Sequence, residues 1–440
     1  MTSAGAEPGA KRARRPLALL HDPEFAALAS VRFVSGMAFA TIIIALALYA
    51  DLFEASGLVA GLFGSAYAVV RLVLVLPLGR KIDLGNSKRY LLWGLALNVA
   101  LLVGFTLVQA IEHVVFLRGF QAVGSIILWI TGVAVVGEIA PDDGRALWIG
   151  TYNQVRSIAS LLGDVVGGAM LFLYGFQTTW TALTLLTCCS VAAVYVFVRD
   201  DPGTRSDPDE ATGLETFGKL LRRRAIVALV VFRFAFSFGK MAVIIFLPIY
   251  ARTAFGMNAL LIGGILAGGK LTKGLVQGRV GEWADRVGGY QRFIVAGTVG
   301  YAIGTALIPA ASLVQGTVSP LTIAGLGREI AIGAPFVVLF TAYAILGVAD
   351  SFRLPTSMAM FVEEGEHYDA VAGSLSLRSV SWQVGAIVGP LAVGGTLDYV
   401  SVAAGFWLAA GFMLVAGALF VHLYEVEPDP EPVGAPTAED

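Results

Sequence analysis

Long apolar runs separated by short polar stretches dominate the sequence. A helix needs about 20 mainly apolar residues to cross the hydrocarbon core of a membrane. We count twelve such runs, six on each side of a polar linker. They lie near residues 28–50, 58–79, 90–110, 114–137, 148–172, 179–198, 226–250, 259–279, 291–313, 334–358, 371–395 and 399–423. The pattern predicts an all-α integral membrane protein with twelve transmembrane helices.

Polar segments divide the chain into five predicted regions. These are an N-terminal tail at 1–24, a six-helix bundle at 25–198, a linker at 199–224, a second six-helix bundle at 225–423 and a tail at 424–440. The last of these holds four prolines and six carboxylates from Glu425 onward, a composition that predicts disorder.

The positive charges predict the orientation in the membrane. Eighteen Lys and Arg residues lie in connections on one side, including four in the N-terminal tail, whereas Arg252 and Arg328 lie on the other. Cytoplasmic connections carry the excess of Lys and Arg. We therefore expect both termini and the linker in the cytoplasm, and a multi-pass protein of the cell membrane.

The composition fits lipid as the main solvent. Apolar residues make up 57% of the chain and charged residues only 14%, which is too little polar surface for a soluble globule. The 52 glycines predict close helix packing, with Gly57, Gly61 and Gly64 on one such face. We expect the adjacent Cys188 and Cys189 to be small core residues.

The two halves of the chain repeat one another. At an offset of 201, seven residues of 31–50 recur identically in 232–251, among them Arg32 as Arg233. At an offset of 222, Arg156, Ser157, Gly163 and Gly167 recur as Arg378, Ser379, Gly385 and Gly389. Both copies start in the cytoplasm, so parallel repeats with a substrate site between them are expected.

Two cytoplasmic loops carry the residues of a family resemblance. After the second and eighth predicted spans stand Gly79-Arg-Lys-Ile-Asp83 and Gly281-Glu-Trp-Ala-Asp285-Arg286-Val-Gly. They resemble the loop motif of the major facilitator superfamily (MFS). The resemblance implies that Gly79, Asp83, Gly281, Asp285 and Arg286 act in the cytoplasmic gate.

Further motifs extend the resemblance over most of the chain. Arg118-Gly-Phe-Gln121-Ala-Val-Gly124 looks like the family's RxxQGxG. The glycines around Asp164 and those after Gly389 resemble its GPxxGG element, although Asp164 replaces the usual Pro. The family is one of secondary transporters, so the resemblance implies an MFS fold and a coupling role for Arg118.

Ionisable residues within the predicted spans are strongly biased toward cations. There are ten Lys and Arg residues and only two comparably deep acids, Asp164 and Asp350. The cations are Arg32, Arg71, Arg118, Arg156, Arg233, Lys240, Lys270, Lys273, Arg353 and Arg378. A charged side chain in lipid is costly and is therefore a functional candidate by default. The excess predicts an electropositive cavity.

Lys240 and Lys270 lie near the centres of their spans, where their repeat mates are the neutral Phe39 and Val69. This asymmetry favours substrate binding, in which we include Arg71 and Lys273; a buried ion pair with Asp164 or Asp350 is the alternative.

Arg156 and Arg378 are repeat mates, suited either to a shared anionic ligand or to holding their bundles together. Asp350 and Arg353 can pair at i, i+3, and we assign both, with Asp164 as a proton carrier, to coupling. Arg32 and Arg233 lie nearer span ends, which favours structural roles.

The sequence thus predicts a secondary active transporter that moves a small anion by alternating access. The main alternative is a proton-coupled exporter of lipophilic compounds, and a third is a non-transporting sensor on the same fold. We expect no enzymatic activity, cofactor, metal or nucleic-acid partner. The expected partners are a small-molecule substrate, membrane lipid and a coupling proton or ion, and the expected state is a monomer.

Overall fold

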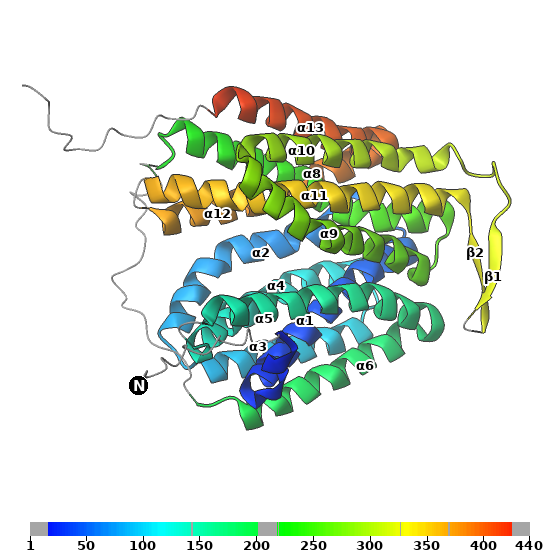
Figure 1. The fold of residues 1–440 in the computed structure, drawn as a ribbon. Helices are drawn as coiled ribbons and strands as arrows, with labels where there is room; N and C mark the ends of the chain where they lie inside the picture. The colour runs from blue at the N-terminus through cyan, green and yellow to red at the C-terminus, as the bar shows by residue number, and fades with distance from the viewer. Residues whose placement is uncertain are drawn as a thin grey trace, which may run out of the picture. The chain divides into compact units, whose positions relative to one another are not determined.

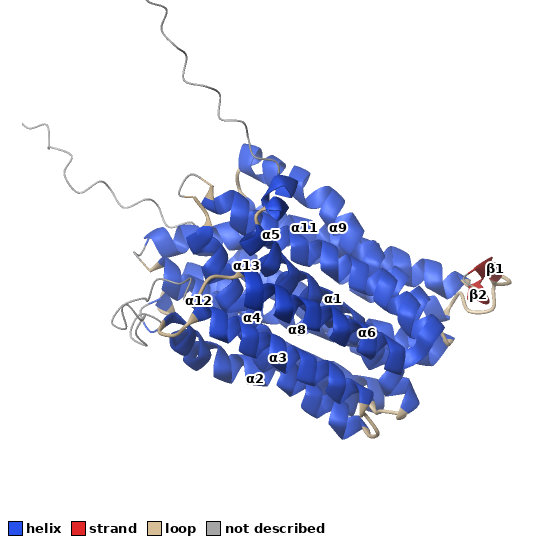
Figure 2. Ribbon diagram, turned by 90° about the horizontal axis from the view of Figure 1, so that it is seen from below, coloured by secondary structure: helices blue, strands red, loops and turns tan. Residues whose placement is uncertain are grey.

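The computed structural model describes residues 16–141, 144–200, 218, 220–325, 327–367 and 370–424. The predicted N-terminal basic cluster, most of the linker, the acidic tail and the side chain of Asp83 lie outside the described residues. Helices make up nearly all of the described chain (Figure 2), as the apolar runs predict.

The described residues form twelve α-helices and three short non-α helical segments. Figure 1 shows how they are arranged along the chain. Before the linker they are η1 Pro16–His21, α1 Pro23–Leu52, α2 Gly57–Asp83, α3 Ser87–Thr106, α4 Ile111–Ile139, α5 Arg145–Leu162, the π-helical η2 Gly163–Gly167 and α6 Gly168–Phe197. After it come α8 Arg224–Phe255, α9 Ala259–Val287, α10 Tyr290–Leu307, η4 Ile308–Ser312, α11 Ala334–His367, α12 Val371–Tyr399 and α13 Val402–Leu423.

Eleven helical segments of the described chain are long and apolar enough to cross a membrane. The predicted fifth and sixth spans fall together in the 53-residue run Arg145–Phe197. A straight helix of that length would be roughly 80 Å long at 1.5 Å per residue. The run is not straight, because Gly175 has a φ of 75° and a ψ of −171°, which breaks the helix between the two predicted spans.

A β-hairpin that the apolar pattern did not predict precedes α11. Strand β1, Leu321–Gly325, pairs antiparallel with β2, Arg328–Ile332. Both strands are largely exposed, and Figure 1 shows the hairpin extending from the end of α11. The sequence pattern that indicates this hairpin is local. Short runs that contain Ile and Thr flank a turn in which Gly327 has a φ of 73°.

The described residues form two compact units. The first unit comprises residues 1–45 and 73–209, and the second unit comprises 46–72 and 210–440. The predicted six-helix halves place 46–72 in the first bundle instead, and they stay a prediction. In the first unit, Phe25, Leu95, Trp148 and Tyr152 belong to a buried core formed by α1, α3, α4, α5 and α6.

In the second unit, α8 is the most buried helix and packs against α11, α12 and α13. Glycines allow α2 to approach α12 in the same unit: a Cβ on Gly61 would lie 2.6 Å from the carbonyl oxygen of Pro390. Gly57 and Gly64 face Gly394 and Pro390, so the predicted packing face is used.

The prediction for Cys188 and Cys189 is wrong, because both are free and exposed on α6. In a membrane protein an apolar side chain gains little by leaving a lipid-facing surface, so hydrophobicity does not report burial.

Candidate functional site

Asp350 on α11 is the centre of a buried charge cluster in the second unit. Its Oδ2 accepts hydrogen bonds from the Nζ of Lys240 on α8 at 2.8 Å and from the Nζ of Lys273 on α9 at 2.5 Å. Its Oδ1 accepts from Nη2 of Arg353 at 2.6 Å. Three cations therefore share one carboxylate, and the cluster carries a net charge of about +2 with all groups ionised.

The members of the cluster are buried to different extents. The side chains of Asp350 and Arg353 are 4% and 0% exposed, whereas those of Lys240 and Lys273 are 19% and 27% exposed. A buried charge is tolerated only when it is paired and hydrogen-bonded. Asp350 meets that condition, and the two lysines are the members that a solute could reach.

Close approach of α9 and α11 brings Lys273 to Asp350. A Cβ on Gly347 would collide with the carbonyl oxygen of Gly269, so only glycine fits this crossing. The hydroxyl of Ser351 donates to the carbonyl oxygen of Lys273 at 3.2 Å, which fixes the two helices in register. Lys273 and Asp350 each lie about one turn beyond the glycine of their own helix.

A similar approach of α8 and α12 places two more arginines nearby. A Cβ on Gly385 would collide with the backbone of Phe234, and the hydroxyl of Ser237 donates to the carbonyl oxygen of Trp382 at 2.5 Å. The guanidinium carbon of Arg233 lies 4.1 Å from the centre of the Trp382 ring. Arg233 lies within electrostatic range of Arg353, as does Arg378 on α12.

Aromatic rings line the cluster. The guanidinium carbon of Arg353 lies 3.7 Å from the ring centre of Phe236. The Nζ of Lys240 lies 6.0 Å from the same ring and 5.9 Å from that of Tyr301. The negative faces of these rings favour a cation over them, so they help to hold positive charge away from water.

The other predicted substrate residues have these positions. Lys270 is half-buried on α9, next to Gly269, and Arg71 is half-buried on α2, with its Nη1 3.4 Å from the hydroxyl of Tyr67. Arg156 is exposed on α5 and belongs to the first unit, whereas its repeat mate Arg378 belongs to the second.

Three ionisable residues of the first unit are buried. Arg118 is 0% exposed, donates from Nη1 to Oε1 of Gln121 and lies 5.7 Å from the ring centre of Phe39. Asp164 is also 0% exposed and lies in the π-helical turn η2. Arg32 donates to Oδ1 of Asn153 at 3.1 Å.

The described gate residues lie near helix ends. Asp285 accepts a hydrogen bond from the hydroxyl of Tyr290 at 3.1 Å, and Arg286 pairs with Glu282 at 3.3 Å. Gly281 lies within α9, and Gly79 lies within α2, where a Cβ would be 3.7 Å from Ile130.

Sequence reasoning missed a second ion pair of the second unit. Nε of Arg252, at the end of α8, donates to Oδ2 of Asp51, at the end of α1, at 2.7 Å. Nearby, Asp398 accepts from the backbone N–H groups of Gly57 and Leu58 at 2.5 and 2.8 Å, capping α2. The internal repeat could have indicated this ion pair, because Asp51 and Arg252 are related by the offset of 201.

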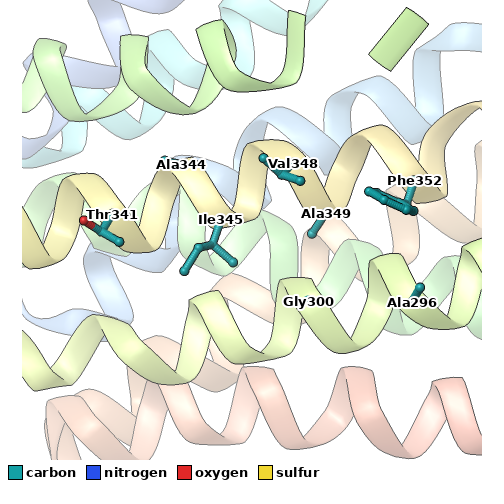
Figure 3. A pocket seen from close by; sticks show the side chains of 8 residues that line it. All are labelled: Ala296, Gly300, Thr341, Ala344, Ile345, Val348, Ala349 and Phe352. Atoms are coloured by element: carbon teal, nitrogen blue, oxygen red, sulfur yellow. The ribbon is translucent and has the colours of Figure 1, made fainter. Parts of the chain in front are cut away.

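A groove of about 350 Å³ between α10 and α11 is not a polar site. Figure 3 shows its lining, which includes Gly300, Ile345, Val348 and Phe352. Thr341 supplies the one side-chain hydroxyl of this lining. Such a surface suits an acyl chain or another apolar group, so the charges near Asp350 are the better candidate for solute recognition.

Comparison with known proteins places the chain among transporters. The family model of the Major Facilitator Superfamily matches residues 28–329 and 271–440. A relative from Methanocaldococcus jannaschii, known as an uncharacterised MFS-type transporter, is 21% identical over 367 residues, which are 81% of this chain and 87% of that protein.

Solved structures show the same fold at low sequence identity. A bacterial homologue of the human lysosomal transporter Spinster, in an inward-facing and occupied conformation, has a TM-score of 0.67 and 14% identity, covering 94% of this chain and 97% of that one. A peptide transporter of the POT type in complex with sulfate has a TM-score of 0.72 and 14% identity, covering 91% and 94%. The family model covers nearly the whole chain, and this protein therefore belongs to the Major Facilitator Superfamily, the membrane transporters that its loop motifs resemble.

Proposed function

We propose that this MFS transporter is a secondary active carrier of a small anion and works by alternating access. One observation carries the proposal: in the second unit three cations bind Asp350, and Arg233 and Arg378 lie within electrostatic range of Arg353. Intramembrane charges of one sign are costly, so their retention favours a ligand of the opposite sign.

Lys240 and Lys273 are the proposed substrate contacts of the Asp350 cluster, because they are its partly exposed members. Asp350 neutralises only part of their charge. An arriving anion would compete with Asp350 for the two ammonium groups, and the carboxylate would reclaim them after release. We propose the same role for Lys270, Arg71, Arg156 and Arg378.

Coupling is proposed at the buried carboxylates. Three cations keep Asp350 ionised, so a proton would reach it only after an anion has displaced it from the two lysines, which links proton and solute. Arg353 would keep the carboxylate oriented, since it pairs with Oδ1 while the lysines use Oδ2. We propose the corresponding coupling role for Asp164 and Arg118 in the first unit.

The topology proposed for this carrier has twelve spans with both termini in the cytoplasm, in a monomer of the cell membrane. The break at Gly175 supports two spans within Arg145–Phe197, because a bilayer core of about 30 Å holds only about 20 helical residues. Asp285, Arg286 and the other loop residues would serve the cytoplasmic gate. Asp51 and Arg252 would serve the opposite one.

Export of lipophilic compounds driven by protons is the second candidate. It is favoured by the fully buried Asp164 in the π-helical turn, since π-turns often mark functional sites. Phenylalanines on α8, such as Phe236 and Phe238, would supply an apolar wall.

Reconstituted protein in liposomes distinguishes these candidates. We expect uptake of at least one labelled carboxylate, phosphate ester or inorganic anion, and loss of that uptake in Lys240→Gln. Glu112→Gln serves as a control, because it removes an exposed carboxylate outside the cluster. Uptake of lipophilic cations alone, unchanged in Lys240→Gln, would replace the anion proposal with the exporter.

A further inference from the structure

Three arginines of the second unit bury N–H groups for which the described residues supply no acceptor. They are Nε and Nη1 of Arg233, Nε and Nη1 of Arg353, and Nε of Arg378. Arg233 is 7% exposed and Arg353 is 0% exposed. Buried donors are almost always hydrogen-bonded in native proteins, so five such groups on neighbouring side chains require an explanation.

The surroundings limit how a ligand could approach these side chains. The Trp382 ring lies over one face of the Arg233 guanidinium at 4.1 Å, and the Phe236 ring lies over one face of Arg353 at 3.7 Å. The buried Nε and Nη1 groups on the in-plane edges have no acceptor among the described residues. A planar fork of N–H donors matches the two oxygens of a carboxylate or phosphate group.

The repeat provides an internal comparison. In the first unit, the matched Arg32 donates to the side chain of Asn153 at 3.1 Å. At the offset of 222, the position that corresponds to Asn153 is Leu375, which has no side-chain acceptor. The second copy thus keeps the arginine and lacks the amide. A bound anion would take the place of that acceptor.

We propose that Arg233, Arg353 and Arg378 form an oxyanion subsite that takes the carboxylate or phosphate group of the transported solute. Asp350 holds Nη2 of Arg353 and leaves its other N–H groups for the ligand. Arg378 is only half-buried, so the ligand would enter the subsite from the side of Arg378. The inference deepens the proposed function and rests on it, because it names the chemical group that an anion carrier would recognise.

Equilibrium binding to the purified, delipidated full-length protein tests the subsite. Acetate, inorganic phosphate and chloride are titrated by calorimetry into the wild type, Arg233→Lys and Arg378→Lys. Lysine keeps the charge and removes the fork. A hydrogen bond to a charged group contributes about 1.5–3 kcal/mol, so we expect acetate or phosphate to bind roughly 10- to 100-fold more weakly to either variant.

Arg32→Lys is the matched control, because it makes the same change in the first unit, and its oxyanion affinity should equal that of the wild type. Melting curves without ligand confirm that each variant is folded. Lys240→Gln separates the two proposals: if it alone abolishes oxyanion binding while both arginine variants bind normally, the subsite is refuted and the anion carrier stands.

Three further outcomes would also refute the subsite. Chloride binding as tightly as acetate and phosphate would remove the argument from the planar fork. Occupancy by the headgroup of phosphatidylglycerol in nanodiscs, with no binding of either free oxyanion, would make the arginines a lipid site. Stabilisation by lipophilic cations alone would refute both the subsite and the anion carrier.

Discussion

Replacing Asp350 with Asn removes the carboxylate that three cations share and changes little else in side-chain volume. Lys240, Lys273 and Arg353 would then face one another at short range without a counter-ion. Arg353 cannot escape by losing its proton, because a guanidinium stays charged in proteins.

The structure sets the size of the effect. Removing one partner of a buried ion pair costs about 3–5 kcal/mol. The partial exposure of Lys240 and Lys273, 19% and 27%, lets water relieve some of their charge, whereas Arg353 at 0% has no such relief. We therefore expect Asp350→Asn to lose about 3 kcal/mol, at the lower end of that range.

A double-mutant cycle with Lys240→Met measures the effect as a coupling. In the wild-type background Lys240→Met should cost little, because Asp350 keeps Lys273 and Arg353 as partners. In the Asp350→Asn background the same change removes a repelling charge and should restore part of the melting temperature. A coupling energy above about 1 kcal/mol is expected for groups in one network.

The assay is thermal unfolding of the detergent-solubilised protein at one fixed scan rate, because unfolding of large proteins is often irreversible. Asp51→Asn is the control: it breaks an ion pair whose members are 37% and 32% exposed, so it should shift the melting temperature far less. Equal losses from Lys240→Met in both backgrounds would refute the shared-counter-ion reasoning.

Two other predictions concern the packing and the second ion pair. Gly347→Val should abolish the folded protein in size-exclusion chromatography, because its side chain would collide with the backbone of Gly269; normal expression of a monodisperse protein would contradict the close helix crossing. Arg252→Asp should slow transport and expose the neighbouring turn to a membrane-impermeant thiol reagent at an introduced cysteine, because it places like charges opposite each other. Adding Asp51→Arg should restore the pair, and failure of this swap to rescue transport would argue against a gate contact.

Much of the helical fold could be predicted from hydropathy, because the length of a span is set by the bilayer rather than by tertiary contacts. The helix ends could not. Helix α11 continues to His367, beyond the predicted end at 358, because its last turns are polar and a hydropathy window cannot separate a polar helix from a loop. The hairpin at Leu321–Ile332 was missed because the search for long apolar runs ignores short alternating strands.

The sequence predicts which residues form the candidate site better than it predicts the contacts between them. The i, i+3 spacing of Asp350 and Arg353 predicted their pairing, which the structure has at 2.6 Å. Lys240 precedes Asp350 by 110 positions in the chain, so its ion pair depends on helix packing and was only one of two alternatives. Arg233 was considered structural from its depth, and only its buried, unmatched N–H groups point to a ligand.

Differences between repeat mates locate the chemistry better than the matches do. Matched positions such as Arg156 and Arg378 can be kept by helix packing alone, whereas packing gives no reason for a buried charge whose repeat mate is neutral. Lys240, whose repeat mate is the neutral Phe39, is one such case. Asp51 and Arg252 differ in another way, because these repeat mates carry opposite charges and bind each other directly. Duplication supplies a frame with two equivalent sets of positions, and a carrier that recognises one asymmetric solute must make those sets different. The charges of the second unit are therefore where substrate recognition should be tested first.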